Sequence, residues 1–335
     1  MKGLTQMSDS NRPNSFLIND DCLNAMSYMS DGLIDLTVTS PPYDNLRDYK
    51  GHEWNEGVWK QALKELYRVT KQGGVLVWIV GDAVVKGSET GTSFKQALHA
   101  IECGFKLHDT MIWEKPHFSN PSSNRCHQIF EYMFIFSKGK PNTFNQIKDV
   151  PIKYGKPVGK SSQRHKDGSI TNTVAKGSKG EFGARKNIWK INSAGQENFG
   201  KKVSHPAQFS LQLAKDHVLS WSNEGDLVFD CFSGAGTVGL ASKQLKRRFI
   251  GVEIAEEYHR IAMERIGLTD SDIQIPMPIK PVNNHESAEL SDNYLVVDAN
   301  GIVYEAFYDF DSSAWMGAED DKEVAGVIDF MSRCY

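Results

Sequence analysis

The chain has only five cysteines and no long hydrophobic run, and both features limit the classes of protein to which it can belong. The cysteines are Cys22, Cys103, Cys126, Cys231 and Cys334, and no two of them form a Cys-x-x-Cys pair. A disulfide framework or a zinc site is therefore not expected, and a reducing cytoplasm fits this pattern. No apolar stretch approaches the roughly 20 residues of a transmembrane helix. The N-terminal segment also lacks the apolar core of a signal peptide.

The composition is that of a globular protein, with an uneven distribution of charge. The 335 residues suit one large α/β domain or two modest ones, and the net charge is −4. Residues 283–335 hold 12 acidic and 2 basic residues, whereas residues 138–202 hold 15 basic and 4 acidic ones. A basic block of this density indicates a surface for a polyanion. A solvated loop is the alternative that composition leaves open.

Short apolar runs alternate with amphipathic segments, which predicts a twisted, mostly parallel sheet with helices on both faces. The expected strands are 16–19, 33–38, 74–81, 106–113, 131–137, 226–230 and 248–254. The expected helices are 57–70, 92–104, 207–222 and 236–248. No helix separates 106–113 from 131–137, so we expect these two strands to form an antiparallel pair at one edge of the sheet.

A glycine-rich turn follows the strand that ends at Asp230. Gly234, Gly236 and Gly239 match the pattern G-x-G-x-x-G and open a helix, and Glu253 ends the next strand, 19 residues after Gly234. Glycines let the backbone approach a ligand closely, and an acid at this spacing accepts hydrogen bonds from a ribose. The segment therefore predicts a cofactor that contains a nucleoside.

The acid at the start of this turn bears on which cofactor binds. The pyrophosphate of NAD favours a helix N-terminus and would be repelled by a nearby carboxylate. S-adenosylmethionine has no phosphate, and its ammonium group favours an acid such as Asp230. The sequence thus favours S-adenosylmethionine over NAD.

Two adjacent prolines, Pro41 and Pro42, interrupt the chain after the strand 33–38. Proline has no N–H group and a fixed φ, so the pair ends the strand in a stiff loop. Beside it, Ser40 offers a hydroxyl and Tyr43 an aromatic face. Taken singly, these residues also suit an ordinary strand end with a packed ring.

The segments "TSPPY" (39–43) and "DCFSGAGT" (230–237) together resemble the catalytic and cofactor motifs of the amino-methylating DNA methyltransferases. The catalytic motif comes first, with the basic insertion between the two, as in the permuted β group of that family. The resemblance covers about residues 14–267. One departure is Cys231, where the family usually has proline.

The resemblance implies a Rossmann-like S-adenosylmethionine-dependent methyltransferase fold with circularly permuted motif order. The implied reaction is direct methyl transfer to the exocyclic amine of a base flipped out of double-stranded DNA. Ser40 and the Pro41 carbonyl would accept the amine hydrogens, the prolines would hold these acceptors still, and Tyr43 would stack on the base. Serine at position 40 favours cytosine N4 as the target, and adenine N6 is the near alternative.

The resemblance also divides the chain and names site residues. The divisions are 14–138 (catalytic part), 139–203 (basic insertion for target recognition), 204–269 (cofactor-binding part), 270–284 (linker) and 285–335 (acidic unit without an assigned role). The implied cofactor-binding residues are Asp21, Asp230, Phe232, Ser233, Gly234, Gly236, Thr237 and Glu253. The implied DNA-binding residues are Arg47, Arg164, Lys166, Arg185 and Lys186.

Some of these assignments have alternatives. Glu253 is expected at the ribose and Asp21 near the adenine, but Asp21 also suits a helix N-cap. An NAD-dependent oxidoreductase would explain the glycine turn and leave "TSPPY" without a role. A DNA-binding module without catalysis would explain the basic block alone. A separately encoded restriction endonuclease is a further partner that the resemblance implies.

Overall fold

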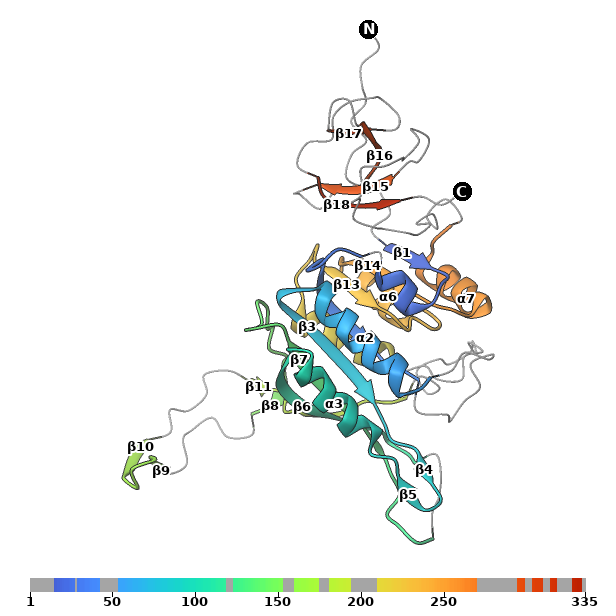
Figure 1. The fold of residues 1–335 in the computed structure, drawn as a ribbon. Helices are drawn as coiled ribbons and strands as arrows, with labels where there is room; N and C mark the ends of the chain where they lie inside the picture. The colour runs from blue at the N-terminus through green and yellow to red at the C-terminus, as the bar shows by residue number, and fades with distance from the viewer. Residues whose placement is uncertain are drawn as a thin grey trace.

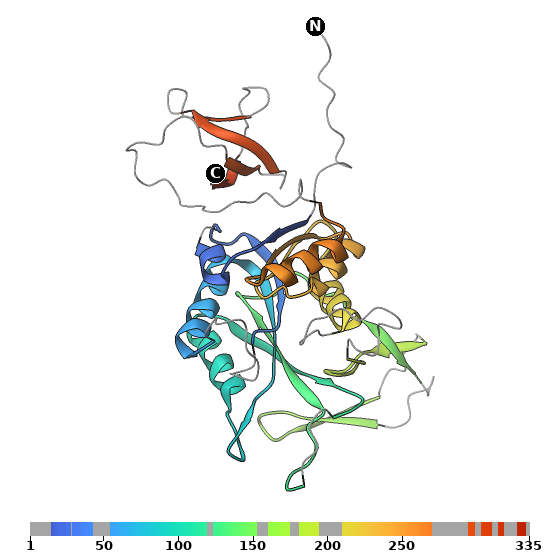
Figure 2. The same cartoon turned by 90° about the vertical axis from the view of Figure 1, so that its right-hand side faces the viewer.

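The computed structural model shows a central sheet between two layers of helices (Figures 1 and 2). The structure describes residues 15–27, 29–42, 54–118, 123–152, 160–174, 181–193, 210–269, 294–298, 303–309, 314–317 and 327–332.

The central sheet has eight strands in the order β1-β14-β13-β2-β3-β7-β6-β12. Only β7 runs antiparallel to its neighbours, and all other pairs are parallel. The strands are β1 (Ser15–Ile18), β2 (Ile34–Thr39), β3 (Thr70–Val80), β6 (Lys106–Glu114), β7 (Phe130–Ser137), β12 (Ile188–Lys190), β13 (Leu227–Asp230) and β14 (Arg248–Val252). The carboxyl ends of β2 and β13, which carry the two motifs, therefore lie side by side.

Helices cover both faces of this sheet, as its buried side chains require. The helices are α1 (Cys22–Ser27), α2 (Glu56–Val69), α3 (Thr92–Glu102), α5 (Leu211–Trp221), α6 (Thr237–Gln244) and α7 (Glu256–Ile266). Leu76 and Trp78 of β3 face the core under α1, α2 and α3. Val75 and Val77 face the second core, under α5, α6 and α7. The alternation along β3 thus places the sheet at the middle of three layers.

A few helices and strands differ from those predicted from the sequence. The helix predicted over 236–248 ends at Gln244, because Lys246 adopts a positive φ of 59° before β14 begins. Helix α7 was not predicted, and α1 was expected only in the alternative that makes Asp21 a helix N-cap. The antiparallel pair β6–β7 is present as expected, and β12 adds one further strand beyond it.

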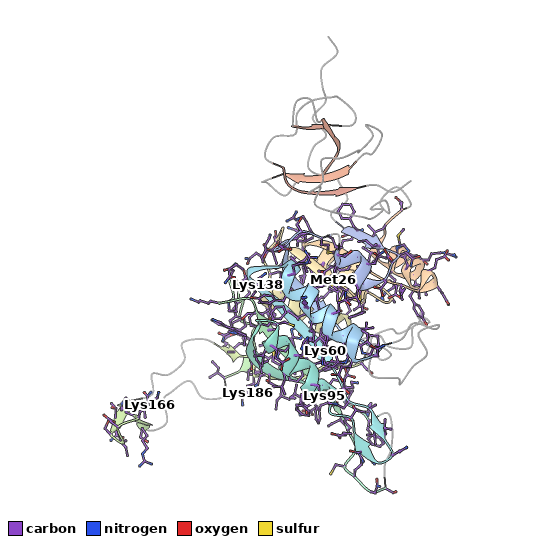
Figure 3. The ribbon with its side chains drawn as sticks, viewed as in Figure 1. Met26, Lys60, Lys95, Lys138, Lys166 and Lys186 are labelled. Carbon is purple, nitrogen blue, oxygen red and sulfur yellow. The ribbon has the colours of Figure 1, made fainter. Side chains whose placement is uncertain are left out.

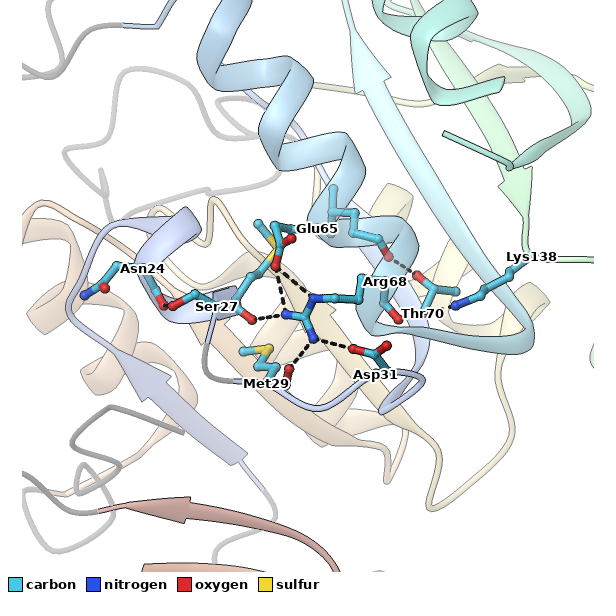
Figure 4. Close-up of polar contacts among 10 residues, drawn as sticks. Asn24, Ser27, Met29, Asp31, Glu65, Arg68, Thr70 and Lys138 are labelled. Atoms are coloured by element: carbon cyan, nitrogen blue, oxygen red, sulfur yellow. Dashed lines mark hydrogen bonds and ion pairs between the residues drawn. The ribbon is translucent and has the colours of Figure 1, made fainter. Parts of the chain in front are cut away.

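Arg68 at the end of α2 joins the connection between α1 and β2 to the body of the domain (Figure 4). Its guanidinium donates to the carbonyls of Met26 and Met29 and to the carboxylates of Asp31 (2.7 Å) and Glu65 (2.8 Å). Carbonyls at a helix end and in a loop need such partners when partly buried. This network holds the segment that leads into β2 and thus into the Ser-Pro-Pro segment that follows it.

The basic insertion contributes two small sheets and the edge strand of the large one. Strands β8 (Lys148–Pro151) and β11 (Phe182–Ala184) pair, as do β9 (Lys160–Arg164) and β10 (Ile170–Val174). Strand β12 pairs with β6 and buries Trp189, whose side chain is 6% exposed. The insertion is therefore attached to the central sheet through β12. Its limits at 139 and 203 stay predictions.

Four C-terminal strands form a separate antiparallel sheet in the order β17-β16-β15-β18. They are β15 (Tyr294–Asp298), β16 (Val303–Asp309), β17 (Ala314–Gly317) and β18 (Val327–Ser332).

In the part of the chain that the structure describes, no helix is long and apolar enough to span a bilayer.

Candidate active site

One buried hydrogen bond joins the two motifs. The Thr39 hydroxyl, at the end of β2, donates to Oδ1 of Asp230, at the end of β13, over 2.7 Å. Thr39 and Asp230 are 0% and 1% exposed. Because Ser40 follows Thr39 directly, this bond sets the position of the loop predicted to be catalytic relative to the glycine-rich loop predicted to bind the cofactor, residues 230–237.

Burial shifts the titration of Asp230 strongly. It raises the pKa of this carboxyl from 3.8 to about 7, and the nearby Glu253 adds to the rise. Hydrogen bonds from Thr39 and from the Phe232 backbone N–H (3.1 Å) act in the opposite direction, because they favour the carboxylate. The group is thus poised between its neutral and its charged form near neutral pH.

Glycine is required at two positions, Gly236 just before α6 and Gly239 within it. Gly236 has a φ of +73°, and a Cβ there would lie 2.8 Å from the Cβ of Ala262 on α7. Gly239, one turn into the helix, would place a Cβ 2.6 Å from the Phe249 ring and closer still to Ile266. The loop therefore sits directly against β14 and α7, as the G-x-G-x-x-G pattern predicts.

The loop residue Ser233 provides a test of whether a polar cofactor fits. Its hydroxyl is buried and has no hydrogen-bond partner among the described residues. A buried hydroxyl without a partner is costly and requires an explanation such as an absent ligand. Together with the glycine-lined backbone and Asp230, it fits a polar ligand such as S-adenosylmethionine at this loop.

Glu253 directly follows β14, and Asp21 follows the neighbouring strand β1 by three residues. Glu253 accepts hydrogen bonds from the backbone N–H groups of Gly234 and Ala255, at 2.8 and 2.9 Å. This places its carboxylate at the glycine turn, where a ribose is expected. Asp21 accepts from the N–H groups of Leu23 (2.8 Å) and Asn24 (3.2 Å), so it caps α1. Its role near the adenine stays a prediction.

Phe232 packs between two tryptophans that sequence reasoning did not select. Its ring meets Trp54 edge-on at a centroid distance of 5.2 Å and Trp78 at 6.3 Å. The indole N–H of Trp78 donates to Gln96 on α3 over 2.9 Å. These contacts fix one wall of the cofactor loop against the helical layer.

Arg265 on α7 is a second residue that the sequence did not reveal. Its guanidinium donates to the carbonyl of Ala235 at 2.5 Å and to the hydroxyl of Thr237 at 3.4 Å. Burial lowers its pKa. It supports the cofactor loop from behind, and 28 to 30 residues separate it from its two partners.

The predicted catalytic residues are only partly described. Ser40 and Pro42 are half-buried and Pro41 is buried, all directly after β2. Tyr43 and Arg47 lie outside the described residues. The structure therefore brings Ser40 and Pro41 beside the cofactor loop, through Thr39.

Of the predicted DNA-binding residues that the structure describes, three are exposed and one is held in ion pairs. Arg164, Lys166 and Lys186 are exposed. Figure 3 shows Lys166 on the β9–β10 hairpin and Lys186 near the main body. Arg185 instead pairs with Asp149 and, at 2.5 Å, with Asp216 of α5. These ion pairs attach Arg185 to the protein itself, and its contact with DNA stays a prediction.

Arg185 also belongs to a stack that anchors the insertion. Its guanidinium lies 5.0 Å from the centre of the Trp189 ring, and this ring also stacks on the ring of His217 on α5 at 4.6 Å. His217 is fully buried, and burial lowers its pKa to about 3, so the ring is neutral at pH 7. The stack holds β12 against the helix layer that supports β2 and β13.

Among the described residues, no cluster of histidine, cysteine and acidic side chains could hold a metal ion. A doubly wound sheet with a glycine-rich turn at the carboxyl end of a central strand is the arrangement of Rossmann-like nucleoside-binding domains. The family model described as DNA methylase matches residues 34–264. The chain belongs to this family, whose members act on amino groups of DNA bases with S-adenosylmethionine as methyl donor. The oxidoreductase alternative is therefore wrong.

Named relatives agree with this assignment. The chain is 52% identical over 242 residues to the orphan methyltransferase M.BamHII of Bacillus amyloliquefaciens, covering 71% of this chain and 90% of the relative. It is 28% identical over 297 residues to the type II methyltransferase M.SmaI of Serratia marcescens, covering 77% and 92%.

Solved structures show the same fold. The PvuII DNA methyltransferase, described as cytosine-N4-specific, superimposes with a TM-score of 0.54 at 20% identity, over 77% of this chain and 90% of that one. The M1.HpyAVI complex with S-adenosylmethionine gives 0.52 at 22% identity, over 76% and 100%. Both confirm the predicted fold class.

Proposed function

We propose that the protein transfers a methyl group to the exocyclic N4 of cytosine in a base flipped out of double-stranded DNA. The observation that carries methyl transfer is the bond between Thr39 and Asp230, because it holds Ser40 and Pro41 beside the cofactor loop. The choice of cytosine is supported by the serine at position 40. When bound there, S-adenosylmethionine supplies an electrophilic methyl group.

The amine of cytosine is a poor nucleophile, because its lone pair is delocalised into the ring. The Ser40 hydroxyl and the Pro41 carbonyl are placed to accept its two hydrogens and to orient the lone pair. Neither Pro41 nor Pro42 carries an N–H group that would compete as a donor. The chain thus contributes orientation and fixed dipoles rather than a covalent intermediate.

The remaining proposed residues bind different parts of the cofactor. Asp230 in its ionised form would attract the positive end of the cofactor, Glu253 would accept from the ribose, and the Ser233 hydroxyl would gain the partner that it lacks among the described residues. Phe232 would cover the loop from the side of Trp54 and Trp78. Asp21 would lie near the adenine.

The duplex itself is proposed to bind through the basic insertion. Arg164, Lys166 and Lys186 are exposed and can neutralise phosphates or reach base edges. Tyr43 and Arg47 are proposed to stack on the base and to face DNA. Since several relatives are named type II methyltransferases, a separately encoded restriction endonuclease that cuts the same site is a proposed partner.

The base is tested by incubating the enzyme with unmethylated DNA and S-adenosylmethionine and identifying the methylated nucleosides by mass spectrometry. We expect N4-methylcytosine. N6-methyladenine alone would refute the choice of base and support the alternative that Ser40 also permits. No methylated nucleoside from a folded enzyme that binds the cofactor would refute the proposed activity.

A further inference from the structure

A projection extends beyond the carboxyl edge of the sheet, next to the catalytic loop. Strands β4 (Val84–Val85) and β5 (Ser88–Glu89) form a hairpin directly after β3 (Figure 1). A second segment, residues 115–118 and 123–129, connects β6 to β7 at the same edge. We call the hairpin and this segment the paired projection.

Hydrogen bonds make the paired projection one unit with a fixed base. Arg125 of the second segment donates to the Gly87 carbonyl at the hairpin tip over 2.6 Å. At the base, Asp82 accepts from the Thr90 hydroxyl (3.3 Å) and from the backbone N–H (2.9 Å) and hydroxyl (2.5 Å) of Ser93 on α3. The hairpin is therefore held at both ends.

The strand register places the paired projection beside Ser40. Thr39 at the end of β2 pairs with Trp78 of β3, so Ser40 lies near the level of Ile79. The hairpin tip, Lys86 and Gly87, comes seven to eight residues later along β3 and its extension. At about 3.3 Å per residue the tip reaches at most about 25 Å past that level. The paired projection therefore extends from the strand next to β2, on the side of the sheet where Ser40 lies, within reach of a duplex whose base enters there.

The exposed side chains of the paired projection suit nucleic acid. Phe118 is 44% exposed and lies 3.9 Å from the His127 ring, and Val84 and Val85 are 45% and 54% exposed. An exposed aromatic ring offers a flat face for bases, and apolar side chains can wedge between base pairs beside a kink.

The tip itself has the charge of a contact site. Lys86 is exposed, and its positive φ of 50° with 82° at Gly87 is that of the two-residue turn that joins β4 to β5. Arg125 adds a second positive charge at the same tip. Both can face phosphates.

We infer that the paired projection is a second DNA-contacting element, distinct from the basic insertion, which holds the duplex beside the flipped base. Lys86 contacts the DNA backbone, and the tilted ring pair Phe118–His127 packs against bases exposed by flipping. This inference rests on the proposed action on duplex DNA.

The test uses the variants Phe118→Ala and Lys86→Glu of the full chain. Leu98→Ala and Lys95→Glu are matched controls, because these residues are exposed on α3, with Leu98 63% exposed. The probe is a duplex that carries the wild-type methylation site, with 2-aminopurine at the target base. DNA affinity against salt, 2-aminopurine fluorescence and S-adenosylmethionine affinity are measured for each.

We expect Phe118→Ala to weaken DNA binding at least about fivefold and to reduce the fluorescence rise on flipping. Lys86→Glu should weaken DNA binding and lower the salt dependence, with cofactor affinity unchanged in every variant. If both variants bind and flip DNA like their controls while the wild type methylates DNA, the inference is wrong. A wild type without methyl transfer would instead refute the proposed function.

Discussion

The cofactor loop after β13 and the hairpins of the basic insertion present opposite kinds of surface. Asp230, Ser233 and Thr237 are at most 6% exposed, and arginine and threonine side chains from α7 and β2 hold the loop in place. Arg164 and Lys166 on the β9–β10 hairpin are exposed. The cofactor loop is held in place by the protein's own side chains, whereas the β9–β10 hairpin presents charged side chains to the solvent.

The difference follows from what each region is proposed to bind. A small cofactor needs a polar site held to a fraction of an ångström, because its methyl group must meet the base amine in one geometry. A duplex attracts through phosphates, whose charge acts without exact contact and falls with salt. Changes in the first region should therefore affect chemistry, and changes in the second should affect affinity.

The largest effect is expected at the boundary of the first region, in the double variant Ser40→Ala/Tyr43→Ala. It removes the proposed hydroxyl acceptor and the proposed stacking ring together. Methyl transfer should fall at least about 100-fold, by analogy with the removal of a fixed transition-state partner.

The same variant separates catalysis from binding. Calorimetry should show S-adenosylmethionine affinity close to that of the wild type, and DNA binding should be largely kept. Methyl transfer at the wild-type rate would leave a catalytic role for "TSPPY" without support. It would also show that the acceptors lie elsewhere.

The next effect concerns the bond that joins the two motifs. Thr39→Val removes the hydroxyl that donates to buried Asp230, and an unsatisfied buried partner costs about 1–3 kcal/mol. The free energy of unfolding and the methyl transfer rate should both fall. Urea denaturation and single-turnover kinetics measure the two quantities.

Strand β2 offers a matched control for this change. Thr37 is also 0% exposed, but its hydroxyl has no hydrogen-bond partner among the described residues. Thr37→Val should therefore leave stability unchanged or raise it. Equal losses from both valine variants would show that the Thr39 hydroxyl contributes nothing specific.

Local sequence was enough to predict the glycine turn and the Ser-Pro-Pro loop, because their chemistry lies within a few residues. The alternation of apolar runs also predicted the three-layer fold. The link through Thr39 was not predicted, because it depends on which strands are neighbours in the sheet. Arg265 was missed for the same reason, since it reaches the loop from a helix that the sequence did not reveal.

The insertion shows a second limit of local reasoning. Strand β12 has three residues within a polar segment, too short for a period to be recognised. Its place in the sheet comes from Trp189, which stacks on buried His217. Arg185 was selected for DNA because of its charge, and its carboxylate partners Asp149 and Asp216 lie far away in the sequence.

A smaller, pH-dependent effect is expected at Asp230. Its pKa of about 7 in the folded protein exceeds the 3.8 of an ordinary aspartate. The folded state therefore binds more protons, and the stabilisation from this group is complete below pH 3.8 and is lost as the pH rises through 7. Relative to Asp230→Asn, the ligand-free protein should lose stability between about pH 4 and 7, by at most about 1.4 kcal/mol per pH unit.

Cofactor affinity should show the opposite trend. The carboxylate that forms above pH 7 attracts the cationic cofactor, so affinity should rise between about pH 6 and 8. Isothermal titration in buffers of different ionisation heat would also detect the proton that binding releases. An affinity of the wild type that is as flat with pH as that of Asp230→Asn would place this carboxyl away from the cofactor charge.

The smallest effect per residue is expected in the basic insertion. Arg164→Ala and Lys166→Ala should each weaken DNA binding modestly and lower the slope of log affinity against log salt by about 1 if the residue contacts a phosphate. Lys64→Ala is the control, since Lys64 is exposed on α2. The methyl transfer rate at saturating DNA should stay unchanged, because neither residue lies at the cofactor loop. A lower rate at saturation with an unchanged salt slope would contradict the division of roles, and would mean that the hairpin acts on the geometry of the base rather than on the attraction of the duplex.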